Sequence, residues 1–265
     1  MLDAIKTSFL RIREKKPLVL CLTNYVTMDF MANSLLALGA APLMTEDPSE
    51  LEELITLSQA VYINTGTLHH QFTENALYAA SISQKLKKPV LLDPVGAGAS
   101  SVRTSAALSI LPYATIVRGN ASEIMSLSGM SGLTRGVDTS HSVHNALGSA
   151  LSLAQQHNTI VVISGSDDVI TDGDQQQIIP FGSNLMPLIT GMGCTMTAVI
   201  SAFVAVNSHY IKACSQAAAY FSLCGQLTHQ QTQLPGTFKQ RFIDNLYMPD
   251  WNFFADAINH SRIHI

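Results

Sequence analysis

Apolar residues along the chain alternate between short continuous runs and longer stretches with a helical repeat. The short runs are typical of strands buried on both faces. They cover residues 18–24, 41–45, 60–65, 89–94, 114–120 and 159–165. Helical stretches lie between them and include residues 49–58, 71–86 and 141–157. This alternation predicts an α/β fold with three layers, in which helices cover both faces of a mostly parallel central sheet.

The pattern changes after residue 165. Residues 168–181 are typical of a hairpin with a turn at residues 172–174, so we expect the sheet to end in antiparallel strands. Four helices are predicted in the remainder of the chain, over residues 194–207, 210–231, 238–247 and 251–260. Because repeats, low-complexity tracts and Pro/Gly-rich linkers are absent, we expect a single domain over residues 1–265.

Composition narrows the class of protein. Apolar residues make up 47% of the chain and charged residues 13%, about half the usual ~25%. Such a chain can bury a large core and can hide further surface in an oligomer. A net charge of −4 without a basic cluster argues against nucleic acid as a partner. The first ten residues lack the apolar segment of a signal peptide, and the most apolar helical run, around residues 194–206, is too short to span a membrane.

The four cysteines show no spacing suited to zinc or to a disulfide framework. We therefore expect a reducing, cytoplasmic setting, with three of the four cysteines as ordinary core residues.

Polar or glycine-rich segments follow four of the predicted strands. In an open parallel sheet, ligands bind beyond the carboxyl ends of the strands. Each segment alone is equally consistent with a turn or a strand cap. All four are expected at the same edge of one sheet, which indicates a binding site. They are Thr23-Asn24-Tyr25, Asp93-Pro-Val-Gly-Ala-Gly-Ala99, Arg118-Gly-Asn120-Ala-Ser-Glu123 and Ser164-Gly165.

A fifth segment, Thr190-Gly191-Met192-Gly193-Cys194-Thr195, precedes a long apolar helix. Glycines let a backbone approach a ligand closely, and the first N–H groups of a helix point toward an anion. This arrangement suits phosphate or a phosphoryl group in transfer. The structural alternative is a glycine-rich helix start with a buried cysteine.

Several common site motifs are missing or incomplete. No G-x-x-x-x-G-K-[ST] motif of a P-loop occurs. The Gly96-Ala97-Gly98 segment resembles the start of a dinucleotide fingerprint, but Ser101 stands at the third glycine position. An NAD-binding oxidoreductase therefore has weak support.

Histidines and a group of aspartates give no metal site. No third ligand stands at metal spacing near the paired histidines. The aspartates bracket the expected hairpin, and turn residues are the simpler interpretation. The histidines are His69, His70, His141 and His144, and the aspartates are Asp167, Asp168 and Asp172.

The motifs taken together resemble the hydroxyethylthiazole kinase family of the ribokinase-like superfamily. The similarity runs from about residue 17 to residue 247. Met192 and Asp29 depart from the family's usual Thr and Asn. The motifs that carry the resemblance are Asn24-Tyr-Val-Thr with Asn33, Gly39-Ala-Ala-Pro-Leu-Met44, Asp93-Pro-Val-Gly-Ala-Gly-Ala99, Arg118-Gly-Asn-Ala-Ser-Glu123, Gly136-Val-Asp138, Gly191-x-Gly-Cys194 and Pro235-Gly-Thr-Phe with Phe242-Ile-Asp-Asn-Leu-Tyr247.

This resemblance implies a ribokinase-like fold and the ATP-dependent phosphorylation of the thiazole alcohol used in thiamine biosynthesis. It also implies a homotrimer with sites at subunit boundaries and a requirement for Mg²⁺. The implied roles are catalysis by Cys194, thiazole binding by Asn24, Met44 and Gly191, ATP binding by Arg118, Asn120 and Ser164, and organisation of Mg²⁺ by Asp93 and Glu123.

Cys194 lies at the start of a predicted helix, where the helix dipole favours a thiolate. We therefore expect a lowered pKa and the highest reactivity among the four cysteines. A thiolate is a poor base for an alcohol, so we expect Cys194 to position the hydroxyl or to take its proton late.

Two further alternatives stay open. One is a related kinase acting on a pyrimidine, pyridoxal or sugar alcohol, although an Asp is typical at the turn of the sugar kinases. The other is an inactive sensor that binds thiazole or nucleotide.

Overall fold

A central sheet of eight strands organises the computed structural model, which describes residues 1–129 and 143–261. The strand order is β2-β1-β3-β4-β5-β6-β7-β8. Strands β1 to β6 pair in parallel, whereas β7 and β8 run antiparallel to their neighbours. The strands are β1 (Leu18–Leu22), β2 (Ala41–Met44), β3 (Ala60–Asn64), β4 (Val90–Asp93), β5 (Ile116–Asn120), β6 (Ile160–Ser164), β7 (Asp168–Thr171) and β8 (Gln176–Ile179).

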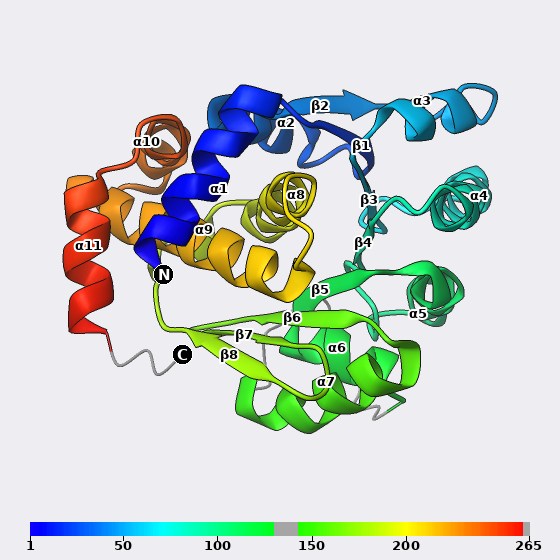
Figure 1. Cartoon of the computed structure of the whole chain (residues 1–265). Helices are drawn as coiled ribbons and strands as arrows, with labels where there is room; N and C mark the ends of the chain where they lie inside the picture. The colour runs from blue at the N-terminus through cyan, green and yellow to red at the C-terminus, as the bar shows by residue number, and fades with distance from the viewer. Residues whose placement is uncertain (130–142, 262–265) are drawn as a thin grey trace.

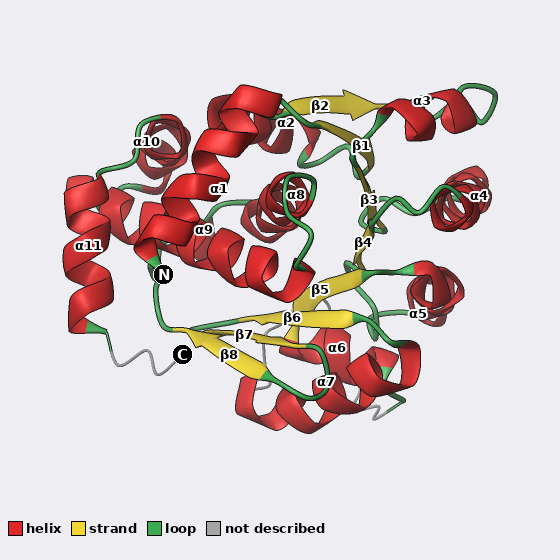
Figure 2. Cartoon of the chain, viewed as in Figure 1, coloured by secondary structure: helices red, strands yellow, loops and turns green. Residues whose placement is uncertain are grey.

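Helices cover both faces of this sheet (Figures 1 and 2). One face is covered by α3 (Leu51–Leu57), α4 (His70–Lys85), α5 (Ser101–Ile110), α6 (Ala121–Leu127) and α7 (Val143–His157). The other is covered by α1 (Leu2–Lys15), α2 (Met28–Leu38), α8 (Met192–Val204), α9 (Tyr210–Gln231), α10 (Pro235–Tyr247) and α11 (Trp251–His260). Two short 3₁₀ helices, η1 (Leu111–Tyr113) and η2 (Met186–Leu188), lie in connections.

Helix α8 occupies the centre of the second face. Nearly every residue from Met192 to Val204 is buried, because the helix packs between strands β1, β3 and β4 on one side and α2 and α9 on the other. An apolar surface on all sides is what a helix in such a position requires. Its burial fixes the position of its N-terminus at the carboxyl ends of the central strands.

The predicted three-layer α/β architecture with a mostly parallel sheet is confirmed. The expected hairpin is present as β7 and β8. The helix predicted over residues 194–207 begins two residues earlier, at Met192, because Gly191 serves as its N-cap. Among the described helices, none is long and apolar enough to cross a membrane. The Gly136-Val-Asp138 motif and His141 lie outside the described residues.

Candidate active site

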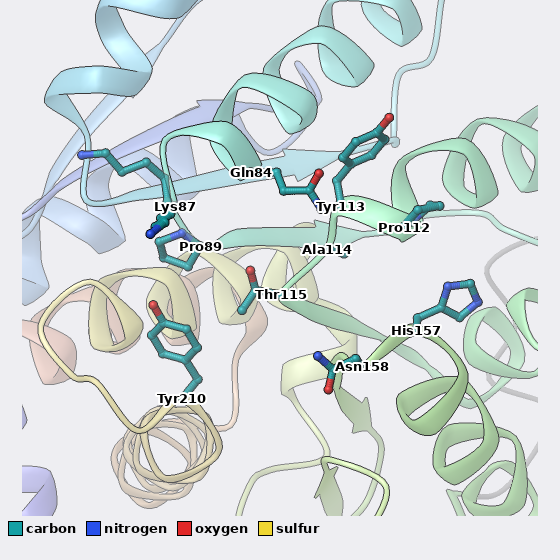
Figure 3. Close-up of a pocket in the computed structure, with 11 residues that line it drawn as sticks. Gln84, Lys87, Pro89, Pro112, Tyr113, Ala114, Thr115, His157, Asn158 and Tyr210 are labelled. Carbon is teal, nitrogen blue, oxygen red and sulfur yellow. The ribbon is translucent and has the colours of Figure 1, made fainter.

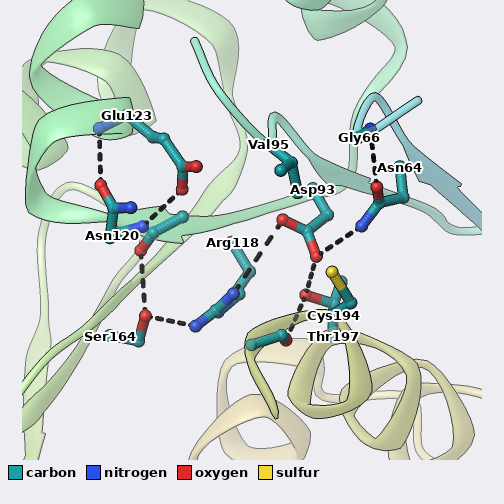
Figure 4. A network of polar contacts seen from close by, with 12 residues as sticks. Asn64, Gly66, Asp93, Val95, Arg118, Asn120, Glu123, Ser164, Cys194 and Thr197 are labelled. Carbon is teal, nitrogen blue, oxygen red and sulfur yellow. Dashed lines mark hydrogen bonds and ion pairs between the residues drawn. The ribbon is translucent and has the colours of Figure 1, made fainter. Parts of the chain in front are cut away.

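The carboxyl ends of strands β1 to β6 bring most of the predicted site residues to one edge of the sheet. Asp93 ends β4, Asn120 ends β5 and Ser164 ends β6, and the N-terminus of α8 meets them from the other side (Figure 4). Met44 ends the edge strand β2, where it pairs with Cys21 of β1. Met44 and Ser164 are therefore at opposite ends of this edge.

The carboxylate of Asp93 is hydrogen-bonded through one oxygen only. Its Oδ2 accepts hydrogen bonds from Tyr62 Oη (3.1 Å), Asn64 Nδ2 (3.0 Å) and Thr197 Oγ1 (2.9 Å). Its Oδ1 is buried and accepts no hydrogen bond from the described residues, and Arg118 Nη1 lies 4.0 Å away. Burial raises the pKa of Asp93, although Arg118 and the three hydrogen bonds oppose this shift. Oδ1 is thus held in a fixed direction and keeps its capacity to bind.

Glu123 lies in the first turn of α6 and closes that helix end. Its Oε2 accepts the Asn120 amide N–H (2.9 Å), and Asn120 Oδ1 accepts the Glu123 N–H (2.9 Å), which forms a capping box. Its Oε1 accepts the N–H of Gly96 (3.0 Å) from the loop after β4. Burial, and then the charge of Asp93, raise the pKa of Glu123 to about 7. The carboxyl group therefore joins two loops of the site and titrates near neutral pH.

Arg118 lies against the first turn of α8. Its Nη2 donates to Ser164 Oγ on the neighbouring strand. A Cβ atom at Gly193 would lie 2.6 Å from Arg118 Nη1, so only a glycine lets the guanidinium approach this closely. Gly191 is required for a second reason: its φ is +89°, and a Cβ there would lie 2.7 Å from Thr27 Cγ2.

The N-terminus of α8 offers two amide donors beside this guanidinium. The Met192 N–H bonds to Ile189 O (3.2 Å), whereas the N–H groups of Gly193 and Cys194 belong to the first turn and have no acceptor within the helix. A cation beside the positive end of a helix is unfavourable by itself. Arg118 and these amides together therefore favour a bound anion between them.

Cys194 faces the other half of the site. Asn24 Nδ2 donates to Asn64 Oδ1 (2.9 Å) and lies 3.5 Å from Cys194 Sγ. Asn24 Oδ1 accepts the N–H and the hydroxyl of Thr27 (3.1 and 3.0 Å), so the orientation of the amide is fixed. Asn24 and Cys194 are buried, with exposed fractions of 3% and 8%.

The predicted low pKa of Cys194 is wrong. Burial, and then the charge of Asp93, raise the pKa of the thiol to about 11, so it is neutral at pH 7. The helix end cannot compensate, because desolvation and a neighbouring carboxylate both disfavour a thiolate. The prediction that the other three cysteines are core residues is confirmed, since all three are free and buried. They are Cys21, Cys214 and Cys224.

Comparison with known proteins shows to which family this chain belongs. A model described as the hydroxyethylthiazole kinase family matches residues 9–250. This chain belongs to the hydroxyethylthiazole kinase family. A Chlamydia felis protein named hydroxyethylthiazole kinase is 45% identical over 254 residues, which cover 95% of this chain and 97% of the relative. A Nitratidesulfovibrio vulgaris (strain DP4) protein of the same name is 42% identical over 253 residues and 95% of both chains.

Solved structures agree with the assignment to the hydroxyethylthiazole kinase family. A hydroxyethylthiazole kinase protein from Pyrococcus horikoshii OT3 superposes with a TM-score of 0.88 at 36% identity, over 96% of both chains. A Staphylococcus aureus pyridoxal kinase solved with ADP superposes with a TM-score of 0.63 over 79% of this chain and 88% of that chain. At 19% identity the second likeness shows the shared fold alone. The chain is thus a kinase with a ribokinase-like fold.

The carboxylates of the site present oxygen atoms of the kind that a magnesium ion would require. Within the described ranges, no three His, Cys, Asp or Glu side chains are grouped to hold a metal by themselves. Among the described residues, none donates a hydrogen bond to Asp93 Oδ1, and each oxygen of Glu123 accepts one backbone N–H. Such oxygens suit a hard cation whose remaining ligands are water and phosphate.

Three side chains of the site were missed in the sequence, namely Tyr62, Asn64 and Thr197. A signal for each was present. Tyr62 and Asn64 are two positions apart on β3, so their side chains lie on the same face of the sheet. Thr197 follows Cys194 by three residues, which places both on one side of α8.

Proposed function

We propose that this kinase transfers the γ-phosphate of ATP to the hydroxyl of 4-methyl-5-(2-hydroxyethyl)thiazole. Family membership supports the substrate, since relatives with this name match almost the whole chain. One structural observation carries the mechanism: the first turn of α8 joins Cys194 on the acceptor side to Arg118 on the phosphate side. An alcohol held at Cys194 and a phosphoryl group held at Arg118 would be neighbours, which is what in-line transfer requires.

Charge neutralisation on the phosphate side would come from the chain itself. Arg118 and the amides of Gly193 and Cys194 are placed to stabilise charge on the equatorial oxygens of the transferred group. Asn120 ends the strand that carries Arg118, Ser164 ends the neighbouring strand, and we assign both residues to ATP binding. Asp93 and Glu123 would hold Mg²⁺ through oxygens and water, and the ion would neutralise phosphate charge.

The acceptor side would work with a neutral thiol. With a pKa of about 11, Cys194 is suited to orient the hydroxyl by a weak hydrogen bond rather than to remove its proton early. The hydroxyl proton would leave late, to an oxygen of the transferred phosphoryl group or to water, because a loose phosphoryl-transfer transition state needs no early deprotonation. We assign Asn24, Met44 and Gly191 to the thiazole side, because Asn24 contacts Cys194 and Gly191 begins the same turn.

The test is ATP- and Mg²⁺-dependent phosphorylation of hydroxyethylthiazole by the purified chain, read by mass spectrometry. Pyridoxal, a hydroxymethylpyrimidine and a sugar serve as competing acceptors, because a related kinase would prefer one of these. Phosphorylation of the thiazole with the highest kcat/KM supports the proposal. A higher kcat/KM for another alcohol would show that the assigned substrate is wrong. Nucleotide binding without turnover on any acceptor would indicate a sensor.

The proposal extends to the setting of the enzyme. We propose a role in thiamine biosynthesis or salvage, a single kinase domain over residues 1–265, a cytoplasmic location consistent with four free cysteines, and a homotrimer. A chain with only 13% charged residues is suited to bury surface between subunits. Light scattering should give about three times the chain mass of 28.6 kDa. A stable and active monomer would contradict the trimer.

A further inference from the structure

One carboxylate beside the site takes no part in the proposed chemistry. Asp168 was expected to be a turn residue, together with Asp167 and Asp172. For Asp172 the expectation is confirmed, since its Oδ1 accepts two N–H groups of the β7–β8 turn. For Asp168 it is wrong: this residue begins β7 and is only 5% exposed.

Asp168 connects one distant segment, helix α9, to the turn after β6. Its Oδ1 accepts the N–H of Gly165 (3.2 Å), and its Oδ2 accepts the hydroxyl of Ser222 from α9 (3.1 Å). Because α9 packs against β7 within the core, Ser222 gives the carboxylate a rigid support. The peptide group that Asp168 holds therefore has a fixed position relative to the core.

That peptide group is the one directly after Ser164. The Ser164 hydroxyl accepts a hydrogen bond from Arg118 Nη2 and lies 3.5 Å from Gly119 O. A shift of the Gly165 peptide would move Ser164 and, with it, a contact of Arg118. Helix α7 packs closely on this turn, since a Cβ at Gly165 would lie 2.4 Å from Val143 Cγ2.

Keeping a charge at this position is costly. Burial raises the pKa of Asp168 to about 6, while the Gly165 amide, Arg118 and Ser222 oppose the shift and Asp167 adds to it. Buried carboxylates with few partners generally weaken a fold. A buried charge so near Arg118 is easier to explain by a role in the site than by a role in stability.

We propose that Asp168 is a positioning residue for nucleotide binding, which fixes the Gly165 amide and, through Ser164, the guanidinium of Arg118. The inference rests on the proposed ATP site and does not depend on which alcohol is phosphorylated. Its effect should therefore fall on the nucleotide and not on the acceptor.

The test compares three variants by calorimetric binding of Mg·ADP and by steady-state kinetics. Asp168→Ala removes the acceptor of the Gly165 N–H and should weaken ADP binding and raise the KM for ATP about tenfold, with the KM for the alcohol unchanged. Asp168→Asn keeps an amide oxygen for Gly165, and the Ser222 hydroxyl can reverse to accept from the new NH₂ group. It should therefore bind ADP within about threefold of the parent.

Asp172→Ala is the matched control. Like Asp168→Ala, it removes a carboxylate that accepts two hydrogen bonds in the same hairpin, here from two backbone N–H groups at the opposite end of β7. It should leave ADP binding unchanged. An equal loss in Asp172→Ala would show that general loosening of the hairpin is responsible, and would overturn the proposal.

Two other results would also overturn it: ADP binding in Asp168→Ala equal to that of the parent, or ADP binding as weak in Asp168→Asn as in Asp168→Ala. If Asp168→Ala does not fold, Ser222→Ala replaces it, because that variant keeps the charge and frees Oδ2 from its support. It should weaken ADP binding about threefold, and unchanged binding would contradict the proposal. ADP binding needs no acceptor, so failure here is distinct from failure of the thiazole assignment.

Discussion

The two edges of the central sheet differ in how their charged side chains are placed. At the carboxyl edge, Asp93, Arg118 and Glu123 are buried and contact one another or backbone amides (Figure 4). At the amino edge, a cavity of about 340 Å³ opens between the ends of β4, β5 and β6 (Figure 3). It is lined by Lys87 and Lys88, among others, but these side chains extend toward solvent or helix ends.

Helix direction explains this difference. The helices that follow the parallel strands begin at the carboxyl edge, so their free N–H groups collect there and favour anions. They end at the amino edge, where carbonyl groups need donors. Lys88 Nζ donates to Thr56 O (2.9 Å) and Ser58 O (2.7 Å) at the end of α3, and His157 closes α7. An open cavity with positive side chains is thus accounted for by helix termini, whereas buried and partly unsatisfied charges mark the site.

Removing Arg118 should have the largest effect. Arg118→Ala is expected to lower kcat/KM for ATP about 100-fold, because a charge-assisted contact to phosphate contributes roughly 1.5–3 kcal/mol. Arg118→Lys keeps the positive charge but lacks the paired N–H donors of a guanidinium. Its kcat/KM for ATP should lie between that of the parent and that of Arg118→Ala. Steady-state kinetics with varied ATP provide the measurement. If the kinetics of Arg118→Ala equal those of the parent, Arg118 does not bind phosphate, and the carboxyl edge loses the main evidence that it is the site.

The role of Glu123 should be visible in the pH dependence of kcat/KM for Mg·ATP. Its pKa of about 7 lies above the ordinary value, so the carboxyl is protonated at pH 6 and ionised at pH 8. If the ionised form organises Mg²⁺, kcat/KM for Mg·ATP should rise with pH through about 7.

The variant Glu123→Gln tests this assignment. In Glu123→Gln, kcat/KM for Mg·ATP should no longer rise with pH through about 7. The variant should have a rate about tenfold lower than the parent at pH 8 and should need more Mg²⁺ for its half-maximal rate. A variant whose pH profile and Mg²⁺ dependence overlay those of the parent would separate Glu123 from the metal.

Replacing Cys194 should have an effect smaller than that of replacing Arg118 and similar to that of replacing Glu123. Cys194→Ala is expected to lower kcat about tenfold, because the weak hydrogen bond that orients the hydroxyl is lost while the amides of the turn remain. Cys194→Ser keeps an acceptor for Asn24 and should retain more activity. With a neutral thiol, kcat of the parent should be flat between pH 8 and pH 9.5. A steady rise over that range in the parent, absent in Cys194→Ser, would restore the thiolate as base.

The amino edge should respond least. Lys88→Ala removes the donor to two carbonyl groups and is expected to lower the free energy of unfolding by about 1 kcal/mol. That loss corresponds to a melting temperature lower by roughly 2–4 °C. Both KM values and kcat should stay as in the parent. A raised KM for ATP would mean that the amino edge takes part in binding and that the contrast between the edges is false.

Local patterns in the sequence determined the layers, the parallel order of elements and the edge at which the site forms. Continuous apolar runs such as residues 60–63 are typical of strands in a covered parallel sheet, and polar segments at the ends of such strands meet at one edge. The glycines at 191 and 193 also indicated a close approach to the helix start. These signals are local, since they depend on burial and on backbone freedom within a few residues.

Tertiary structure alone decided the electrostatics. Cys194 keeps its proton because residues from distant segments bury it and place Asp93 nearby. Asp168 and Asp172 share one hairpin and one residue type, yet the first is buried against Ser222 of α9, whereas the second accepts backbone N–H groups in an exposed turn. The direction of Asp93 depends on Tyr62, Asn64 and Thr197 from two other elements. Desolvation and charge coupling depend on what packs around a group from the whole chain, and no local pattern contains that information.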